Sequence, residues 1–278
     1  MSSNTFPVTG PLEVSCRFGH GALTVRLSDE LSEARVEVTP READSDVDAR
    51  FSVELRGDKL LVEGPKPSRG LFDLSIFTGK YSSRETVDVE IVVPTGSSLK
   101  LGTFAGQIST YGRSGSVEIG TGATTIKLDQ IDGDLKLRYG AGPSQVHRVS
   151  GSAQLKAGSG DLTIAEIDGD LDAAFGSGSL DLGTARGAIK LRAGTGSTTV
   201  ARAQADIDVV TGSGDLTVGL LTGYQARLDV VTGAGRLHTE MPVEQEPGKA
   251  LGSLTIRART GSGDVLIRHA SQPDTAAS

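Results

Sequence analysis

The residues in this chain that could do chemistry are aspartates that recur beside glycines. Asp161, Asp170, Asp215 and Asp264 each follow a glycine and directly precede an apolar residue. Nonapeptide calcium-binding β-rolls also repeat Gly and Asp, but their aspartate lies two residues before the apolar position. The equivalent positions elsewhere in this chain hold Pro143, Ser179, Ala188 and Ser197. The pattern therefore favours aspartates that stabilise turns by bonding their own backbone over calcium ligands.

Other chemical motifs are weak or missing. The runs GSGDLT, GTGSTT and GAGPSQ lead into strand patterns, whereas a phosphate-binding glycine run leads into a helix with a third glycine or a lysine. No G-x-S-x-G, H-E-x-x-H or C-x-x-C occurs. Cys16 is the only cysteine, so no intramolecular disulfide can form, and we expect a buried thiol. His20, His147, His238 and His269 are far apart in sequence and are interpreted as surface residues. We expect no catalytic residue, no cofactor and no metal.

One charged cluster could imitate an acid/base pair. Asp170, Asp172 and Lys190 would lie near one another if residues eighteen apart stack. The surrounding column alternates largely in sign, which is typical of a solvated face whose charges compensate. That column holds Glu118, Lys136, Gln154, Asp172, Lys190 and Asp208. The sequence favours a protein that is not an enzyme, with a carbohydrate-binding or carbohydrate-active β-helix as the alternative. Exposed aromatics for stacking on sugars are few in the repeats.

A repeat of eighteen residues decides which elements position these side chains. Within each unit apolar and polar residues alternate, as in Leu162-Thr163-Ile164, which is the period of a strand and not of a helix. One apolar column holds Leu99, Val117, Leu135, Ala153, Leu171, Ile189 and Ile207, and another holds Leu101, Ile119, Leu137, Leu155, Ala173, Leu191 and Val209. The pattern predicts an all-β fold, a β-solenoid with about eighteen residues per turn, in which each strand pairs with its copies in neighbouring turns.

The positions of the glycines and the sizes of the inward side chains support the same stacking of turns. One glycine column holds Gly142, Gly160, Gly178, Gly196 and Gly214, and we expect it to mark corners. A column with Ala157, Phe175 and Ala193 alternates small and large, as packing between neighbouring turns requires. The pattern restarts twice after an insertion. Leu228 follows Ile207 by one turn plus three residues, and Ile256 follows Leu228 by one turn plus ten residues. Residues 240–252 are therefore expected to leave the coil as a loop.

The chain is expected to have three parts. Residues 1–98 contain strand patterns without the strict period and are interpreted as an irregular β cap, because an open solenoid end is an unpaired sheet edge. A separate small β domain is the alternative. Residues 99–268 form the repeats, and residues 269–278 form a polar, disordered tail. Strands in the cap region are expected at 23–25, 36–38, 51–55, 60–62 and 87–93, and GHGALTV at 19–25 copies the repeat.

Composition narrows the classes of partner. The chain has 278 residues, 37 of them glycine, and a formal charge of -7 with basic residues scattered among acidic ones. This argues against nucleic acid and anionic membranes as partners. No signal-peptide pattern and no run of eighteen apolar residues is present. We expect a cytoplasmic protein without direct membrane insertion.

The stretch VDVEIVVPTGSSLKL at 87–101, followed by recurring GSGDL and DGDL units, resembles a bacterial β-strand-repeat family. This is the domain-of-unknown-function family DUF4097, often labelled "putative adhesin". The resemblance covers about Leu12 to Ile267. It implies a right-handed, single-stranded β-solenoid without assigned enzymatic residues, and an adhesin-like role.

A hydrophobic segment outside the repeats is the main candidate for binding a partner. The stretch RGLFDLSIFTGKYSSRE at 69–85 concentrates Leu71, Phe72, Ile76 and Phe77 between Pro- and Gly-rich flanks. It either projects to dock a protein chain or forms another cap strand with its rings in the core. We therefore predict a structural scaffold that makes protein–protein contact or self-associates, through this segment or through an open solenoid end.

Overall fold

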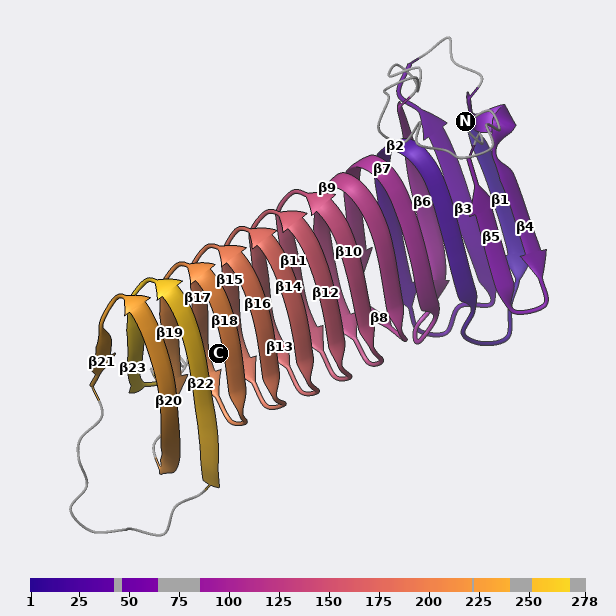
Figure 1. Ribbon diagram of the computed structural model, residues 1–278. Helices are drawn as coiled ribbons and strands as arrows, with labels where there is room; N and C mark the ends of the chain where they lie inside the picture. Colours follow the sequence, from indigo (N-terminus) through magenta and orange to yellow (C-terminus); the bar gives the residue numbers. More distant parts are fainter. Residues whose placement is uncertain (43–46, 65–85, 222, 241–251, 271–278) are drawn as a thin grey trace, which may run out of the picture. The chain divides into compact units, whose positions relative to one another are not determined.

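The computed structural model describes residues 1–42, 47–64, 86–221, 223–240 and 252–270. The chain divides into two compact units, Met1–Gly142 (unit 1) and Pro143–Ser278 (unit 2). Strands form almost all of the described chain, with a single short 3-10 helix, and each unit is a coil of stacked strands (Figure 1). The predicted all-β solenoid is confirmed.

In unit 2 each turn of the coil contains two strands, one in each of two facing layers (Figure 1). The strands of these turns are β11 (Ser144–Val149), β12 (Ala153–Ser159), β13 (Leu162–Ile167), β14 (Leu171–Ser177), β15 (Leu180–Ala185), β16 (Ile189–Thr195), β17 (Thr198–Ala203), β18 (Ile207–Ser213) and β19 (Leu216–Leu220). From β11 to β17 every strand pairs in parallel with the strand of the next turn along the chain. Leu171, for example, lies opposite Ala153 on one side and Ile189 on the other. The predicted eighteen-residue register is confirmed.

The core of unit 2 fills the space between the two layers. Leu171, Ala173 and Phe175 point inward from β14, and Leu180 and Leu182 point inward from β15; all five are buried. Phe175 lies opposite Ala157 and Ala193 in the neighbouring turns. The large ring is therefore accommodated between two small residues, as close packing requires.

Glycines turn the corners between the layers. Gly160, Gly178, Gly196 and Gly214 have φ angles of 126°, 125°, 125° and 136°. At Gly196 an added Cβ would lie 1.9 Å from the carbonyl oxygen of Gly178 in the preceding turn. Only glycine permits both this φ and this approach, so the corner role predicted for the column is confirmed.

The last two turns of unit 2 do not stack in chain order. β22 (Gly252–Ser262) lies between β18 and β20 (Tyr224–Ala234), with Ile256 opposite both Ile207 and Leu228 (Figure 1). β23 (Val265–His269) lies in the same way between β19 and β21 (Leu237–Thr239). The repeat restarts at Leu228 and Ile256, as predicted. In the stack, however, the β22–β23 turn lies between β18–β19 and the β20–β21 turn that precedes it in sequence.

The outward charges favour this order. Stacking in chain order would place Asp208 beside Asp229, whereas the inserted β22–β23 turn places Arg257 between them. The inward residues are more evenly divided. The inserted turn has the larger apolar residue at Leu254 and Ile267, opposite Ala226 and Thr239, and the edge turn has the larger one at Val230 and Leu237, opposite Ala258 and Val265.

Unit 1 contains longer strands that each form a whole turn. β7 (Ser98–Tyr111) pairs in parallel with β2 (Glu13–Ser28) and with β9 (Val117–Ile131), β10 (Leu135–Ala141) pairs with β9, and the short β8 (Arg113–Ser114) also contacts β9. Leu23 lies opposite Ile108, so the GHGALTV motif is a solenoid turn, as predicted. β2 also pairs with β5 (Lys59–Glu63) and β6 (Thr86–Pro94), which form one more turn.

Antiparallel strands complete unit 1. β3 (Glu33–Pro40) pairs antiparallel with β6 and with β1 (Ser2–Pro7), β4 (Ser52–Arg56) pairs antiparallel with β5, and the 3-10 helix η1 spans Val47–Arg50. The strands predicted in this region are confirmed. Val36 and Val38 of β3 are fully buried, so the antiparallel strands cover the β5–β6 turn.

Candidate interaction surfaces

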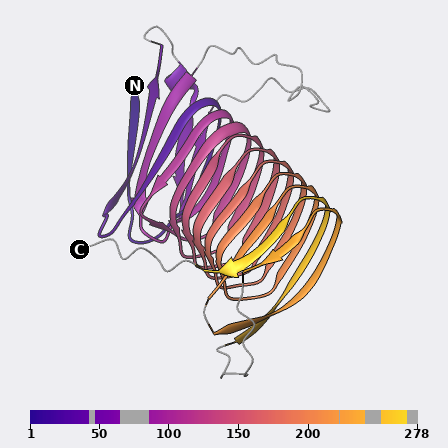
Figure 2. The ribbon, with the colours of Figure 1, turned by 90° about the vertical axis from the view of Figure 1, so that its left-hand side faces the viewer.

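The edge of unit 2 formed by β20 and β21 is open on one side among the described strands, as β1 and β4 also are in unit 1. β20 pairs with β22 and β21 pairs with β23, and no other described strand pairs with either of them. Figure 2 is turned so that this side of unit 2 faces the viewer. The N–H and C=O groups along one side of each strand therefore lack a ladder partner among the described strands, which makes this edge a template for another strand.

Interior positions are uncovered at the same edge. Leu237 lies opposite Val265 in register, yet Leu237 is 46% exposed and Val265 only 1%. Leu228 and Val230, which continue the columns of Ile256 and Ala258, are only half-buried. The apolar core of unit 2 therefore reaches solvent through its last turn.

Successive residues of β20 point alternately outward and inward, and this alternation places the charged side chains on the outer face. Arg227 and Asp229 point outward from β20 and are exposed, whereas Leu228 between them points inward. A hollow of about 490 Å³ on β21 and its neighbours is lined by polar groups that include Arg236, His238 and Glu240. The edge therefore combines apolar interior side chains with outward charges of both signs.

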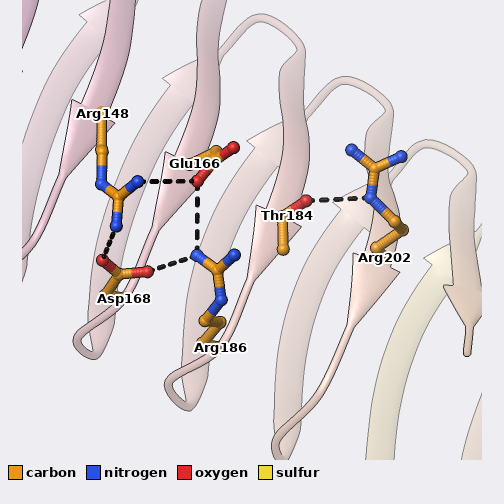
Figure 3. Close-up of polar contacts among 6 residues, drawn as sticks. All are labelled: Arg148, Glu166, Asp168, Thr184, Arg186 and Arg202. Carbon is orange, nitrogen blue, oxygen red and sulfur yellow. Dashed lines mark hydrogen bonds and ion pairs between the residues drawn. The ribbon is translucent and has the colours of Figure 1, made fainter. Parts of the chain in front are cut away.

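A four-residue ion-pair network is formed by Arg148 on β11, Glu166 on β13, and Asp168 and Arg186 in the turns directly after β13 and β15 (Figure 3). The Arg148 guanidinium lies 3.4 Å from Glu166 Oε2 and 2.8 Å from Asp168 Oδ2. Arg186 reaches the same two carboxylates. With two charges of each sign, the network ties neighbouring turns together and has no excess charge to attract an ionic ligand.

The network shifts the pKa values of Asp168 and Arg186. Partial burial alone would raise the pKa of Asp168, but hydrogen bonds from Arg186 and Arg148 outweigh it and hold the pKa below its usual range. The hydrogen bond to Asp168 raises the pKa of Arg186. One turn further on, Arg202 Nε donates to Thr184 Oγ1 at 2.9 Å, where the preceding turn has Glu166 (Figure 3).

The three residues that could imitate an acid/base pair do come together. Asp170, Asp172 and Lys190 line one open groove of about 440 Å³ on the even-numbered strands of unit 2. Asp172 lies beside Lys190 in register, and Asp170 Oδ1 accepts a hydrogen bond from the backbone N–H of Ala188 at 2.9 Å. In this groove Asp172 and Lys190 compensate each other's charge, and Asp170 stabilises a turn.

The repeated aspartates share this structural role. Asp161 Oδ1 accepts from the N–H of Ser179, Asp215 Oδ1 from that of Asp264, and Asp264 Oδ1 from that of Arg236. The turn-stabilising prediction is confirmed, with one correction. The donor belongs to the next turn and not to the aspartate's own backbone, because parallel stacking brings the neighbouring corner within hydrogen-bond distance.

The remaining candidates are separated or buried. Cys16 is fully buried, and burial raises the pKa of its thiol, as expected for an unreactive cysteine. No group of three or more His, Cys, Asp or Glu side chains in the described part of the chain is placed to hold a metal ion. Leu71, Phe72, Ile76 and Phe77 lie outside the described residues. Within the described ranges, no helix has the length and apolar character needed to cross a membrane.

Unit 1 contains a hollow that the sequence does not single out. It measures about 530 Å³, and its lining includes Gly102, Gly120 and Phe104. Gly102 and Gly120 are neighbours in register on β7 and β9, so two missing side chains create the depression. The Phe104 ring is 37% exposed and packs edge-on against His20, with ring centroids 5.4 Å apart. Neighbouring glycines in two turns, followed by an aromatic residue, are the sequence signal for such a hollow.

Comparison with known proteins identifies the sequence type. The family model described as Toastrack DUF4097 matches residues 20–273. Among solved structures, a "putative adhesin" from Bacteroides fragilis NCTC 9343 is 14% identical, with 96% of each chain covered and a TM-score of 0.39. A "putative lipid binding protein" from Parabacteroides distasonis ATCC 8503 is also 14% identical, with 96% of each chain covered and a TM-score of 0.44. The comparison with curated proteins gives no match.

Proposed function

This chain belongs to the Toastrack DUF4097 family, and from that premise we propose that it is a non-enzymatic, adhesin-like scaffold that works by protein–protein contact. Its preferred contact is self-association through the β20–β21 edge. A solenoid suits this role because its turns hold long rows of side chains in fixed register.

The observation that carries the proposal is the uncovered core at this edge. Leu237 occupies an interior column and is 46% exposed. An unpaired strand edge beside exposed apolar side chains favours the addition of a strand from another chain, through main-chain hydrogen bonds and burial of those side chains.

Sedimentation velocity of the full chain over a wide range of concentrations tests the proposal. We expect a reversible rise in mass with concentration. Leu237→Lys should weaken the association, because it places a charge in the contact. The matched control is Val210→Lys, since Val210 is 41% exposed on β18, away from the edge. A wild-type chain that stays monomeric at its highest soluble concentration would refute self-association.

Carbohydrate binding is the alternative, and the unit 1 hollow favours it. An exposed aromatic ring beside Lys100 and Glu118, which form an ion pair at 3.1 Å, combines a stacking surface with hydrogen-bonding groups. A glycan array probed with wild type and Phe104→Ala tests this idea. One saturable glycan that the variant loses would support the alternative, and an empty array would count against it.

The cytoplasmic location predicted from the sequence stays a prediction. Fractionation of the native cell, followed by detection of the chain with a specific antibody, tests it. Recovery in the soluble interior fraction is expected.

A further inference from the structure

On the basis of the self-association proposed above, we propose that a second copy of this chain docks by antiparallel pairing of β20 with β20 of the other copy. The pair is centred on Leu228, so that Arg227 of each copy faces Asp229 of the other. The occupant of the open edge is thus the same edge of an identical chain, related by a two-fold axis.

The geometry of antiparallel pairing limits the register. Residues directly opposite one another point to the same face of the sheet. In β20 the odd-numbered residues from 225 to 231 point outward and the even-numbered residues from 224 to 232 point inward. A two-fold pair that keeps outward residues opposite outward residues must therefore be centred on a residue and not between two residues.

Charge then selects one centre. A pair centred on Arg227 or on Asp229 would place that residue opposite its own copy, and like charges directly opposite one another are unfavourable. Centring on Val230 would place Asp229 opposite Val231. The pair centred on Leu228 places an arginine opposite an aspartate twice.

The same register completes the charge pattern of the face. Within unit 2 the outward column alternates in sign in the stacking order, and ends with a negative charge. That column runs Asp172, Lys190, Asp208, Arg257 and Asp229. Arg227 of a second copy would supply the next positive charge beside Asp229. Arg227 itself lies opposite the neutral Thr255 and makes no ion pair with any described residue.

The inward residues are compatible with this register. Leu228 of each copy would meet Leu228 of the other, and Ala226 would meet Val230. These half-buried side chains would extend the apolar columns that continue from Ile256 and Ala258. Pairing would therefore cover the open core and satisfy the free backbone groups in one step.

Single-cysteine crosslinking tests the register on the full chain. Leu228→Cys places two thiols opposite one another on the two-fold axis, at a separation that suits a disulfide. We expect this variant to form a crosslinked dimer under mild oxidation. Ala226→Cys and Val230→Cys should each stay uncrosslinked alone but crosslink when mixed. Wild type is the control, because its only cysteine, Cys16, is fully buried.

Charge substitution gives a second readout. Arg227→Glu should weaken the dimer by at least about tenfold in dissociation constant, whereas Arg227→Lys should keep most of the affinity. The matched control is Arg259→Glu, which changes the same charge on the outer face of the inserted strand β22. Circular dichroism melts verify that each variant is folded.

The outcomes separate the two proposals. A wild type that associates while Leu228→Cys crosslinks no better than Ala226→Cys or Val230→Cys alone would overturn the β20 register and leave self-association standing. A wild type that never associates would overturn both.

Discussion

The first turns of unit 1 and the last turns of unit 2 both stack out of sequence order, but only in unit 1 do further described strands cover the outermost turn. In both places the chain inserts a turn out of sequence order: β2 lies between the later β5–β6 turn and β7, and β22–β23 lies between β18–β19 and β20–β21. In unit 1 the antiparallel strands β1, β3 and β4 then cover the β5–β6 turn. In unit 2 no described strand covers β20–β21.

This difference shows how a solenoid can limit its own assembly. Antiparallel strands end the parallel stacking in unit 1, because they reverse the strand direction that the next turn would need. The β20–β21 edge keeps the parallel strands exposed. Among the described strands β1 and β4 are also paired on one side only. Contact of the β20–β21 edge with the same edge of a second copy closes into a pair, whereas contact between two different edges would allow filaments to grow.

The largest expected effect tests the inserted turn of unit 1. Gly21, the corner of β2, has a φ of 139°, and an added Cβ would lie 1.8 Å from the carbonyl oxygen of Val87. We expect Gly21→Ala to lower the free energy of unfolding by about 3–5 kcal/mol, from backbone strain and overpacking together. Urea unfolding followed by circular dichroism measures this loss.

Gly19 provides a control two residues away on the same strand. A Cβ at Gly19 would meet no atom within 4 Å. Gly19→Ala should therefore change stability by less than about 1 kcal/mol. Equal losses in the two variants would show that β2 is not confined between its neighbours.

A matched pair of leucines compares the covered and the open edges directly. Leu60 on β5 is fully buried, whereas Leu237 on β21 is 46% exposed. Leu60→Ala should lower the free energy of unfolding by about 2–4 kcal/mol, and Leu237→Ala by less than about 1 kcal/mol. The measurement is urea unfolding at a concentration where the chain is monomeric. A large loss for Leu237→Ala would mean that something covers β21 in solution.

The sequence predicts the turn but not the order of the turns. Register follows from the columns, because a slip of one residue would move Leu171 and Ile189 from the core to solvent. Order does not follow from the repeat, since every turn offers its neighbour a similar set of inward residues. An open solenoid end was predicted, but the turn that forms it, and with it the site at Arg227 and Leu228, was missed. Stacking in chain order would have placed Asp208 beside Asp229, and this conflict of charges was the available signal.

The response to pH tests the turns of unit 2 that lie away from the edge. The folded-state pKa of Asp168 lies below its unfolded value of about 3.9. Its contribution to stability is therefore present above about pH 4 and is lost as pH falls through the lower folded value. Asp168→Asn should cost about 0.5–1 kcal/mol at neutral pH and should show a smaller loss of stability on acidification.

Asp181→Asn is the control for this titration, because Asp181 is exposed on β15 and has no ion pair among the described residues. Urea unfolding at a series of pH values measures both variants. A wild type and an Asp168→Asn variant that lose stability in parallel below pH 4 would show that the network of Figure 3 does not hold this carboxylate in solution.

The smallest expected effect addresses the order of turns itself. Asp208 lies opposite Arg257 in register, and Arg257 lies opposite Asp229, so the two aspartates are two strands apart. A double-mutant cycle with Asp208→Asn and Arg257→Gln should give a favourable coupling of about 0.3–0.5 kcal/mol. The cycle with Asp208→Asn and Asp229→Asn should give none, because two strand spacings are about 9.6 Å. Stacking in chain order would reverse this result: the two aspartates would repel one another, and Arg257 would not couple to Asp208. A coupling of a few tenths of a kcal/mol is thus enough to decide which turn of unit 2 is left at the edge.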